Sequence, residues 1–387
     1  MLDTIVLTLS KSMFILKDPD KFEPSASQIL NANASLGGRG YFSAKQNPTR
    51  TELKNGYYKP RLTLTNRYNH TGRREASLKI ELSLPKLLFG NNFDELTNKD
   101  FDSVTELLQA RLKEMGVLVF TPLLEVAPVS AIHYSKNIPL TDGTTPHFLI
   151  SKIKEANIKL SLDVNQTDYR NDGHSYKWHA NSYEVAFYDK LRDYETAKKS
   201  EKRAIEKDNA IQLNLFEKLE KRQRFEVLRI EVRLNRRHKI RQLFKKLDIH
   251  CEPTYKEIFN PKIAQKVLIH YLDELEERRL PLFDYKPRNS KSLLTDLIIN
   301  NPNLGVLKTI QLYGLKQVFD EVPPRELRQM FNGYSQRSWY RLVAEAKKVK
   351  LPNTPSPLEI IRKSLIYFEP LRLVDFQDLM LNNDKYN

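Results

Sequence analysis

The feature that most constrains the fold of this chain is a set of four short stretches in which apolar and polar residues alternate. The stretches cover residues 78–84, 131–135, 184–190 and 228–233. A period of two residues is typical of β-strands that bury one face and expose the other. If the four strands pair in a single sheet, their polar side chains gather on one face. The reactive side chains expected there are Glu81, His133, Tyr188, Lys190 and Glu231.

Helical patterns accompany these strands and dominate the last third of the chain. Apolar residues recur at helical spacing over residues 101–115, and Gly116 follows as a stop signal. Beyond residue 250 no stretch alternates convincingly, whereas helical patterns recur up to residue 349. We therefore expect an α+β protein with a catalytic domain at residues 1–250 and a helical C-terminal domain at residues 251–387.

The composition narrows the choice of partner. Lys and Arg number 63 against 48 Asp and Glu, which gives a net charge of +15. Such an excess favours a polyanion, with nucleic acid first and an anionic membrane second. No apolar run approaches the length of a membrane span, so we expect no membrane partner. Cys251 is the only cysteine, which excludes an intrachain disulfide and a thiolate-rich zinc site and favours a cytoplasmic setting.

Tyr188 and Lys190 are the first pair with clear chemical potential. They lie two residues apart, so in an extended strand both side chains project to the same side. A tyrosine can attack a DNA phosphodiester to give a phosphotyrosyl link and a free 3′-hydroxyl, and this link retains the energy needed for rejoining. A nearby ammonium would stabilise charge on the phosphate or help to deprotonate the phenol. The structural alternative is a half-buried tyrosine on a sheet, one of 18 in the chain.

Glu81, His133 and Glu231 are the candidate metal ligands. Carboxylates are hard oxygen ligands suited to Mg²⁺ or Mn²⁺, and Mn²⁺ also accepts an imidazole nitrogen. Such an ion would polarise a phosphoryl oxygen and align the scissile bond for attack. For Glu231 an ion pair is a strong alternative, because Arg229 and Arg233 flank it on the same face.

Two basic helical segments are candidate DNA contacts. The pattern over residues 235–247 predicts an amphipathic helix, and residues 324–331 and 335–349 have the proportions of a helix-turn-helix. A solvated basic face or an ordinary helical hairpin would give the same patterns. The candidate contact residues are Arg237, Lys239, Arg241, Lys245, Arg337 and Arg341.

Several blocks occur in the same order as in a known family. The chain resembles the filamentous-phage gene II-type rolling-circle replication initiators and related plasmid initiation factors. The resemblance is carried by residues 1–7, 80–92, 185–190, 228–233 and 338–341, and the blocks around Glu81 and Tyr188 are the most specific.

This resemblance implies a HUH-endonuclease-like antiparallel sheet flanked by helices. It also implies a nick at a replication origin that depends on Mg²⁺ or Mn²⁺, with Tyr188 as nucleophile and origin DNA, host helicase and host polymerase as partners. The chain departs from the pattern at two points. It lacks the paired His-hydrophobic-His motif of the wider class, and it has Ala131-Ile132-His133 where the phage family shows Arg-Ile-Asp. His133 is therefore either a substituted ligand or a lost one.

Three other functions compete with the nicking and joining initiator. A non-enzymatic DNA-binding regulator would use the basic helices and form no covalent adduct. An RNA-binding or RNA-processing protein would use a similar sheet. A metal-dependent hydrolytic nuclease would not need Tyr188. The sequence leaves open whether one subunit acts or a homodimer forms.

Overall fold

The structure is a computed structural model. It describes residues 1–31, 42–49, 51–52, 55, 57–68, 71–156, 167–170, 172–193, 226–277, 282, 285–322, 326–327, 330–331, 333–352, 356 and 358–372. Among these residues, no helix has the length and apolar character that crossing a bilayer requires.

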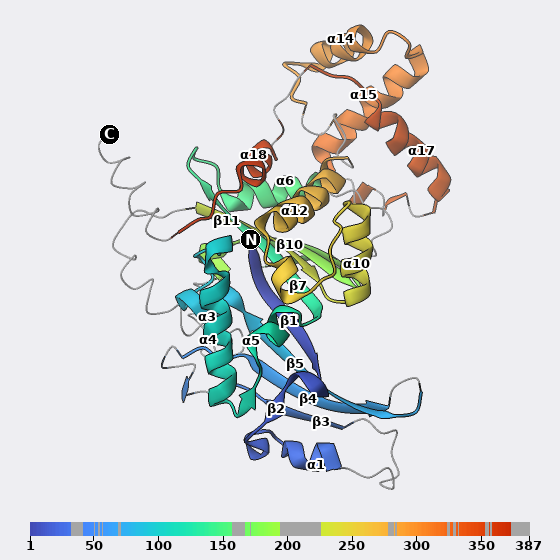
Figure 1. Ribbon diagram of the computed structural model, residues 1–387. Helices are drawn as coiled ribbons and strands as arrows, with labels where there is room; N and C mark the ends of the chain where they lie inside the picture. Colours follow the sequence, from blue (N-terminus) through green and yellow to red (C-terminus); the bar gives the residue numbers. More distant parts are fainter. Residues whose placement is uncertain are drawn as a thin grey trace, which may run out of the picture.

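A nine-stranded antiparallel sheet forms the centre of an α+β fold (Figure 1). Its strand order is β3-β4-β5-β1-β7-β11-β10-β9-β8. The strands are β1 (Leu2–Ser10), β3 (Phe42–Gln46), β4 (Arg61–Tyr68), β5 (Arg74–Ser83), β7 (Val129–Leu140), β8 (Thr167–Arg170), β9 (Ser175–Ala180), β10 (Tyr183–Asp189) and β11 (Glu226–Leu234). A separate pair joins β2 (Ile15–Leu16) to β6 (Val117–Leu118). The four alternating stretches thus lie in β5, β7, β10 and β11, as predicted.

The end of β10 differs from the prediction. Asp189 is the last residue of the strand, and its carboxylate accepts backbone N–H bonds from Leu191 at 3.1 Å and Arg192 at 3.0 Å. Such bonds stabilise a turn into helix, and residues 190–193 are helical. Lys190 therefore lies after the end of the strand. The expectation that residues two apart in a strand project to the same side does not apply to Tyr188 and Lys190.

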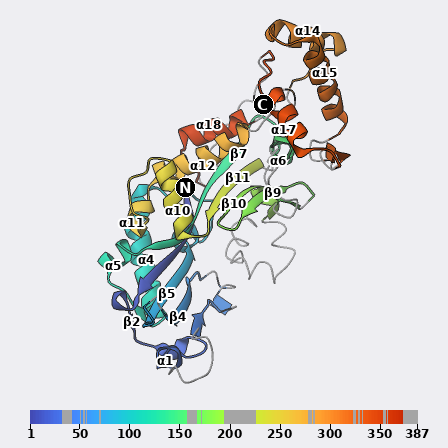
Figure 2. The ribbon, with the colours of Figure 1, turned by 90° about the vertical axis from the view of Figure 1, so that its right-hand side faces the viewer.

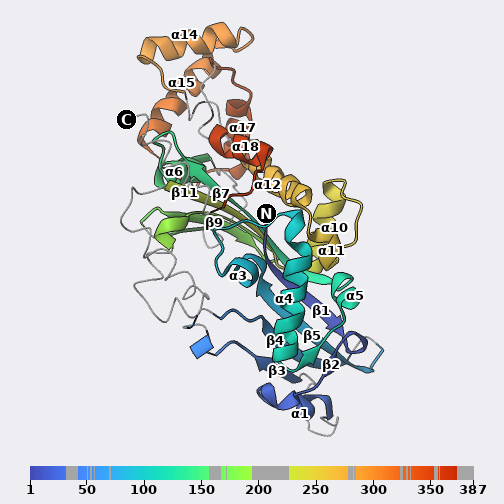
Figure 3. The same ribbon diagram turned by 60° about the vertical axis from the view of Figure 1, so that its left-hand side comes forward.

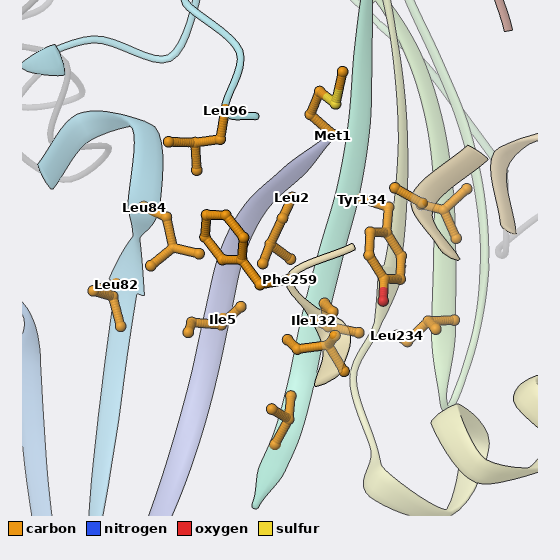
Figure 4. Close-up of a cluster of buried hydrophobic side chains, with 14 of the residues drawn as sticks. Met1, Leu2, Ile5, Leu82, Leu84, Leu96, Ile132, Tyr134, Leu234 and Phe259 are labelled. Atoms are coloured by element: carbon orange, nitrogen blue, oxygen red, sulfur yellow. The ribbon is translucent and has the colours of Figure 1, made fainter. Parts of the chain in front are cut away.

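The apolar face of the sheet carries the main core. Side chains such as Ile5, Leu82, Ile132 and Leu234 point into it from four strands, and the ring of Phe259 packs beside Leu2 and Leu84 (Figure 4). The covering helices include α4 and α5 along one part of the sheet and α10 and α12 along another (Figure 3). The described helices in this body are α1 (Ala26–Asn31), α3 (Leu84–Phe89), α4 (Phe101–Glu114), α5 (Thr121–Glu125), α6 (Pro146–Ala156), α10 (Arg237–Lys246), α11 (Tyr255–Ile258), α12 (Pro261–Glu276) and α18 (Glu359–Tyr367), with 3₁₀ turns at Lys11–Met13, Pro19–Lys21 and Asn98–Asp100.

A second, smaller core lies in the C-terminal part. It joins α14 (Ser290–Asn300), α15 (Val306–Glu321) and α17 (Gln336–Lys347) around side chains that include Leu293, Leu312 and Trp339. We call this part, residues 282–351, the distal helical unit; it lies at one end of the molecule, beyond α12 and α18 (Figure 2).

The division between the two cores does not follow the boundary expected at residue 250. Helix α12 buries Ile263, Val267 and Leu272 against the sheet, and α18 packs beside α12. Both helices therefore belong to the sheet body, because their apolar stripes complete its core.

Candidate active site

The register of three adjacent strands brings polar side chains into rows on the face opposite the main core. Strand β11 pairs with β7 on one side and with β10 on the other. Residues directly opposite each other in such pairs point to the same face. The three rows are His133, Arg233 and Glu184; Ser135, Glu231 and Ala186; and Asn137, Arg229 and Tyr188.

Glu231 is the central acceptor of this face. The hydroxyl of Tyr188 donates to Oε2 of Glu231 at 2.9 Å, and Nε of Arg233 donates to Oε1 at 2.8 Å. Nδ1 of His133 lies 3.5 Å from the same Oε1. The Glu231 side chain is only 4% exposed, so these partners replace water around it. The phenol and a guanidinium are therefore held on the two oxygens of one carboxylate.

Arg229 lies beneath this carboxylate and is almost fully buried. Its Nη2 donates to Oδ2 of Asp3 at 2.7 Å and to Oγ of Ser135 at 2.8 Å, and its Nη1 donates to Oδ1 of Asn137 at 3.1 Å. Its Nε lies 4.0 Å from Oε2 of Glu231 and is buried with no hydrogen-bond partner among the described residues. A buried donor without a partner costs free energy, so this N–H is the one unsatisfied group of the guanidinium.

We call the set Asp3, His133, Glu184, Tyr188, Arg229, Glu231 and Arg233 the Glu231 network. Its electrostatics keep the proton on the phenol in the resting protein. Burial, and then the charge of Glu231, raise the pKa of Tyr188 well above 10. Burial would raise the pKa of Glu231, but Arg233 and Arg229 outweigh it and hold this pKa far below its usual value. Burial also lowers the pKa of His133.

A short segment covers part of this face. Asn91–Glu95, which we call the covering segment, follows α3 and crosses the sheet near β7 and β11. Nη1 of Arg229 donates to the backbone oxygen of Asn92 at 2.7 Å, and Nδ2 of Asn137 donates to that of Phe93 at 2.9 Å. The backbone N–H of Asn137 donates to Glu95 at 2.7 Å. These contacts explain why Arg229 and Asn137 are buried on a face that carries no apolar core.

Lys190 contacts the covering segment. Its ammonium donates to Oδ1 of Asn92 at 2.6 Å and lies 5.1 Å from the centre of the Phe93 ring. Burial, followed by the charge of Arg229, lowers the pKa of Lys190 to about 7. Asn92 thus connects Lys190 to Arg229, and the contacts of the ammonium are with the covering segment.

Glu81 does not join the network. It lies on the same face but in β5, and β1 and β7 separate β5 from β11. Three steps of about 4.8 Å put the two strands roughly 14 Å apart. The Glu81 side chain is 48% exposed, and its carboxylate lies 3.9 Å from the ammonium of Lys79.

The described residues do not fit the divalent metal site predicted from Glu81, His133 and Glu231. No group of three His, Cys, Asp or Glu side chains suited to a metal ion occurs among them. Both oxygens of Glu231 are already engaged, and the other two acidic groups of the network each face an arginine, Asp3 with Arg229 and Glu184 with Arg233. An ion at Glu231 would sit beside two guanidinium groups, which is electrostatically unfavourable.

The predicted DNA contacts lie away from Tyr188. Helix α10 packs its apolar side into the main core, so its basic side chains flank the face opposite the Glu231 network. Arg241 and Arg237 face Glu252 at 2.6 and 4.0 Å, and Lys239 lies over the ring of Tyr183. Lys245 is exposed, as are Arg337 and Arg341 on α17 of the distal helical unit.

The helix-turn-helix prediction is only partly covered by the structure. Helix α17 begins at Gln336 and buries Trp339 and Val343 in the second core, which leaves its basic side to solvent. Of the preceding helix, only residues 326–327 and 330–331 are described. The role of this unit in DNA binding stays a prediction.

Sequence reasoning missed five residues of this site as functional groups: Asp3, Asn92, Glu184, Arg229 and Arg233. The signal for the two arginines was present, because alternation over residues 228–233 puts both on the same side as Glu231. No local pattern marks Asp3 or Asn92, since both reach the network from distant parts of the chain.

The chain was compared with protein-family models, curated proteins and solved structures, and none of them matches it.

Proposed function

We propose that this protein nicks and rejoins one strand of DNA through Tyr188, as a rolling-circle replication initiator does. The observation that carries the proposal is the hydrogen bond between the Tyr188 hydroxyl and the buried carboxylate of Glu231, flanked by two arginines. A nucleophile, a proton acceptor and cationic groups meet there on one rigid sheet. The net charge of +15 supports a polyanionic substrate.

The chemistry follows from these roles. The oxygen of Tyr188 attacks the scissile phosphorus, and its proton passes to Glu231. A new bond forms between the phenolic oxygen and phosphorus while the bond to the 3′-oxygen breaks, and that oxygen leaves as a hydroxyl after taking a proton from water. The hydroxide left behind takes the proton that Glu231 received, so Glu231 is again a carboxylate. Rejoining is the reverse, with a 3′-hydroxyl attacking the phosphotyrosyl link. The arginines stabilise charge on the phosphate, and no step is assigned to a metal ion.

The fold supports the same proposal at a coarser level. An antiparallel sheet with helices packed on one face and reactive side chains on the other agrees with the HUH-like architecture that the resemblance implies. In this proposal the distal helical unit holds duplex origin DNA through Arg337 and Arg341, and recruitment of a host helicase and polymerase follows nicking.

A covalent-adduct assay tests the proposal. Fluorescent single-stranded oligonucleotides tiled across the DNA that flanks the coding gene are mixed with the protein and separated on a denaturing gel. We expect a covalent adduct with the wild-type protein and none with Tyr188→Phe. Tyr183→Phe, on the same strand but on the apolar face, is the matched control and should retain the adduct.

Two outcomes would contradict the proposal. An adduct formed equally by Tyr188→Phe would show that another residue is the nucleophile. DNA binding without any adduct across the tiled set would favour the non-enzymatic regulator.

A further inference from the structure

We propose that Arg233 binds the scissile phosphate and leaves Glu231 as it does so, which couples substrate binding to activation of Tyr188. The inference rests on the proposed function and names the residue that recognises the phosphate. Arg233 contacts the same carboxylate as the Tyr188 hydroxyl, one group on each oxygen. A single phosphate group next to Tyr188 is therefore within reach of Arg233.

Exposure distinguishes Arg233 from the other members of the network. Its side chain is 36% exposed, whereas those of Arg229 and Glu231 are 2% and 4% exposed. Its Nε and Nη1 contact Glu231 and Glu184, both at 2.8 Å. A guanidinium has five N–H donors in a planar fork, so the donors that Glu231 and Glu184 do not use make the first contact with a phosphate from solvent, before Nε leaves Glu231. Arg233 is thus the cation of this site that an incoming DNA strand meets first.

Arg229 supplies the second cationic group. Its Nε is the buried donor with no partner among the described residues, and it faces the Glu231 oxygen that Tyr188 uses. An unsatisfied N–H beside the nucleophile is suited to an oxygen that arrives only with the substrate. Two guanidinium groups near the carboxylate that holds the attacking oxygen fit the doubly substituted, singly charged phosphate of a DNA chain.

The exchange of partners gives the coupling its physical basis. In the resting protein Arg233 is the strongest charge that keeps Glu231 ionised and weakly basic. When a phosphate binds Arg233 in place of Glu231, the negative charge of Glu231 is no longer stabilised by that guanidinium. The pKa of Glu231 therefore rises, and Glu231 becomes a better proton acceptor. The phenol proton then moves to Glu231 as the phenolic oxygen bonds to phosphorus. Tyr188 is thereby activated only when a phosphate is bound.

The test measures charge recognition at the scissile phosphate. The nick site is first located from the adduct formed by the wild-type protein. Two oligonucleotides are then compared, one with the natural phosphodiester at that site and one with a neutral methylphosphonate. The proteins are wild type, Arg233→Ala, Arg233→Lys and, as control, Lys79→Ala, which removes a cation from the same face in β5.

We expect Arg233→Ala to slow adduct formation on the phosphodiester by roughly 100-fold or more, as loss of one transition-state donor does elsewhere. The same variant should lose much less on the methylphosphonate, because that linkage lacks the charge that Arg233 neutralises. Arg233→Lys should fall between, since it keeps the charge without the planar fork. Lys79→Ala should match wild type on both.

A structural role for Arg233 gives a different pattern. Equal slowing of Arg233→Ala on both linkages, or no slowing on either, would overturn the inference while the Tyr188 adduct still supports the proposed function. Absence of any wild-type adduct would reject both together. Fluorescence anisotropy measures the affinity of each folded variant for the oligonucleotide with the natural phosphodiester. This measurement separates loss of binding from loss of the chemical step.

Discussion

Two glutamates on one face of the same sheet have opposite surroundings. Glu81 in β5 and Glu231 in β11 both follow the alternating pattern and both point away from the main core. The Glu81 side chain is 48% exposed and reaches one lysine at 3.9 Å. Glu231 is 4% exposed and contacts a tyrosine, two arginines and a histidine. Alternation determines which face a side chain takes, but the neighbouring strands and the covering segment determine how deeply it is buried.

The difference has a chemical consequence. A carboxylate in water interacts weakly with cations, whereas one in a low-dielectric network is strongly coupled to each of its partners. Only the β11 side can therefore hold a phenol, a base and cationic groups in fixed positions.

The largest expected difference is in stability. Glu231→Gln should lower the free energy of unfolding by about 3 kcal/mol, because it removes the buried negative charge that Arg229 and Arg233 share and leaves two cations with fewer counter-charges. Glu81→Gln should change it by less than about 0.5 kcal/mol, as expected for an exposed pair. Urea denaturation of the two variants beside wild type measures both values. Similar losses of unfolding free energy in Glu231→Gln and Glu81→Gln would contradict the contrast between the β11 and β5 sides of the sheet.

The pH dependence of stability tests the contrast between buried and exposed charges on this face through Lys190. Its pKa of about 7 in the folded protein lies below its ordinary value of 10.5, so between these values the unfolded chain binds more protons. Stability should therefore rise with pH in that window, by up to about 1.4 kcal/mol for each pH unit. Lys190→Met should remove this contribution, and the exposed-side control Lys79→Met should not. Denaturation at pH 7.5 and 9.5 compares the slopes, and identical slopes for wild type and Lys190→Met would contradict the burial of the ammonium.

The smallest effect is expected for metal binding. Mn²⁺ titrations followed by electron paramagnetic resonance should give the same result for wild type, Glu231→Gln and Glu81→Gln, because neither carboxylate lies in a group of metal ligands within the part of the chain that the structure describes. Loss of one tightly bound Mn²⁺ in Glu231→Gln would show that the network rearranges around an ion. Loss in Glu81→Gln would show that β5 carries a site of its own.

Much of the fold could be predicted because its signals are local. Alternation located the four strands, and helical spacing located α4. Gly116, predicted as the stop signal, follows the end of α4 and adopts a positive φ of 80°. The shared face of His133, Tyr188 and Glu231 followed from the period of two. The placement of Lys190 did not, because a cap by the carboxylate of Asp189 ends the strand one residue early.

The rest of the site depends on contacts between distant segments. Strands β1 and β7 lie between Glu81 and Glu231 in the sheet. The residues of the two alternating stretches do not indicate this strand order, so it could not be predicted from them. Asp3 and Asn92 reach Arg229 across 226 and 137 positions of sequence. Whether a carboxylate binds a metal or an arginine is decided by such contacts, which is why the predicted metal site and the observed network differ.

The central claim is that the Tyr188 oxygen becomes bonded to DNA phosphorus. The most direct measurement is mass spectrometry of the adduct after digestion with trypsin and nuclease. We predict a nucleotide attached to the peptide that contains Tyr188, with fragment ions placing it on that side chain. A nucleotide on any other residue, with Tyr188 unmodified, would contradict the account.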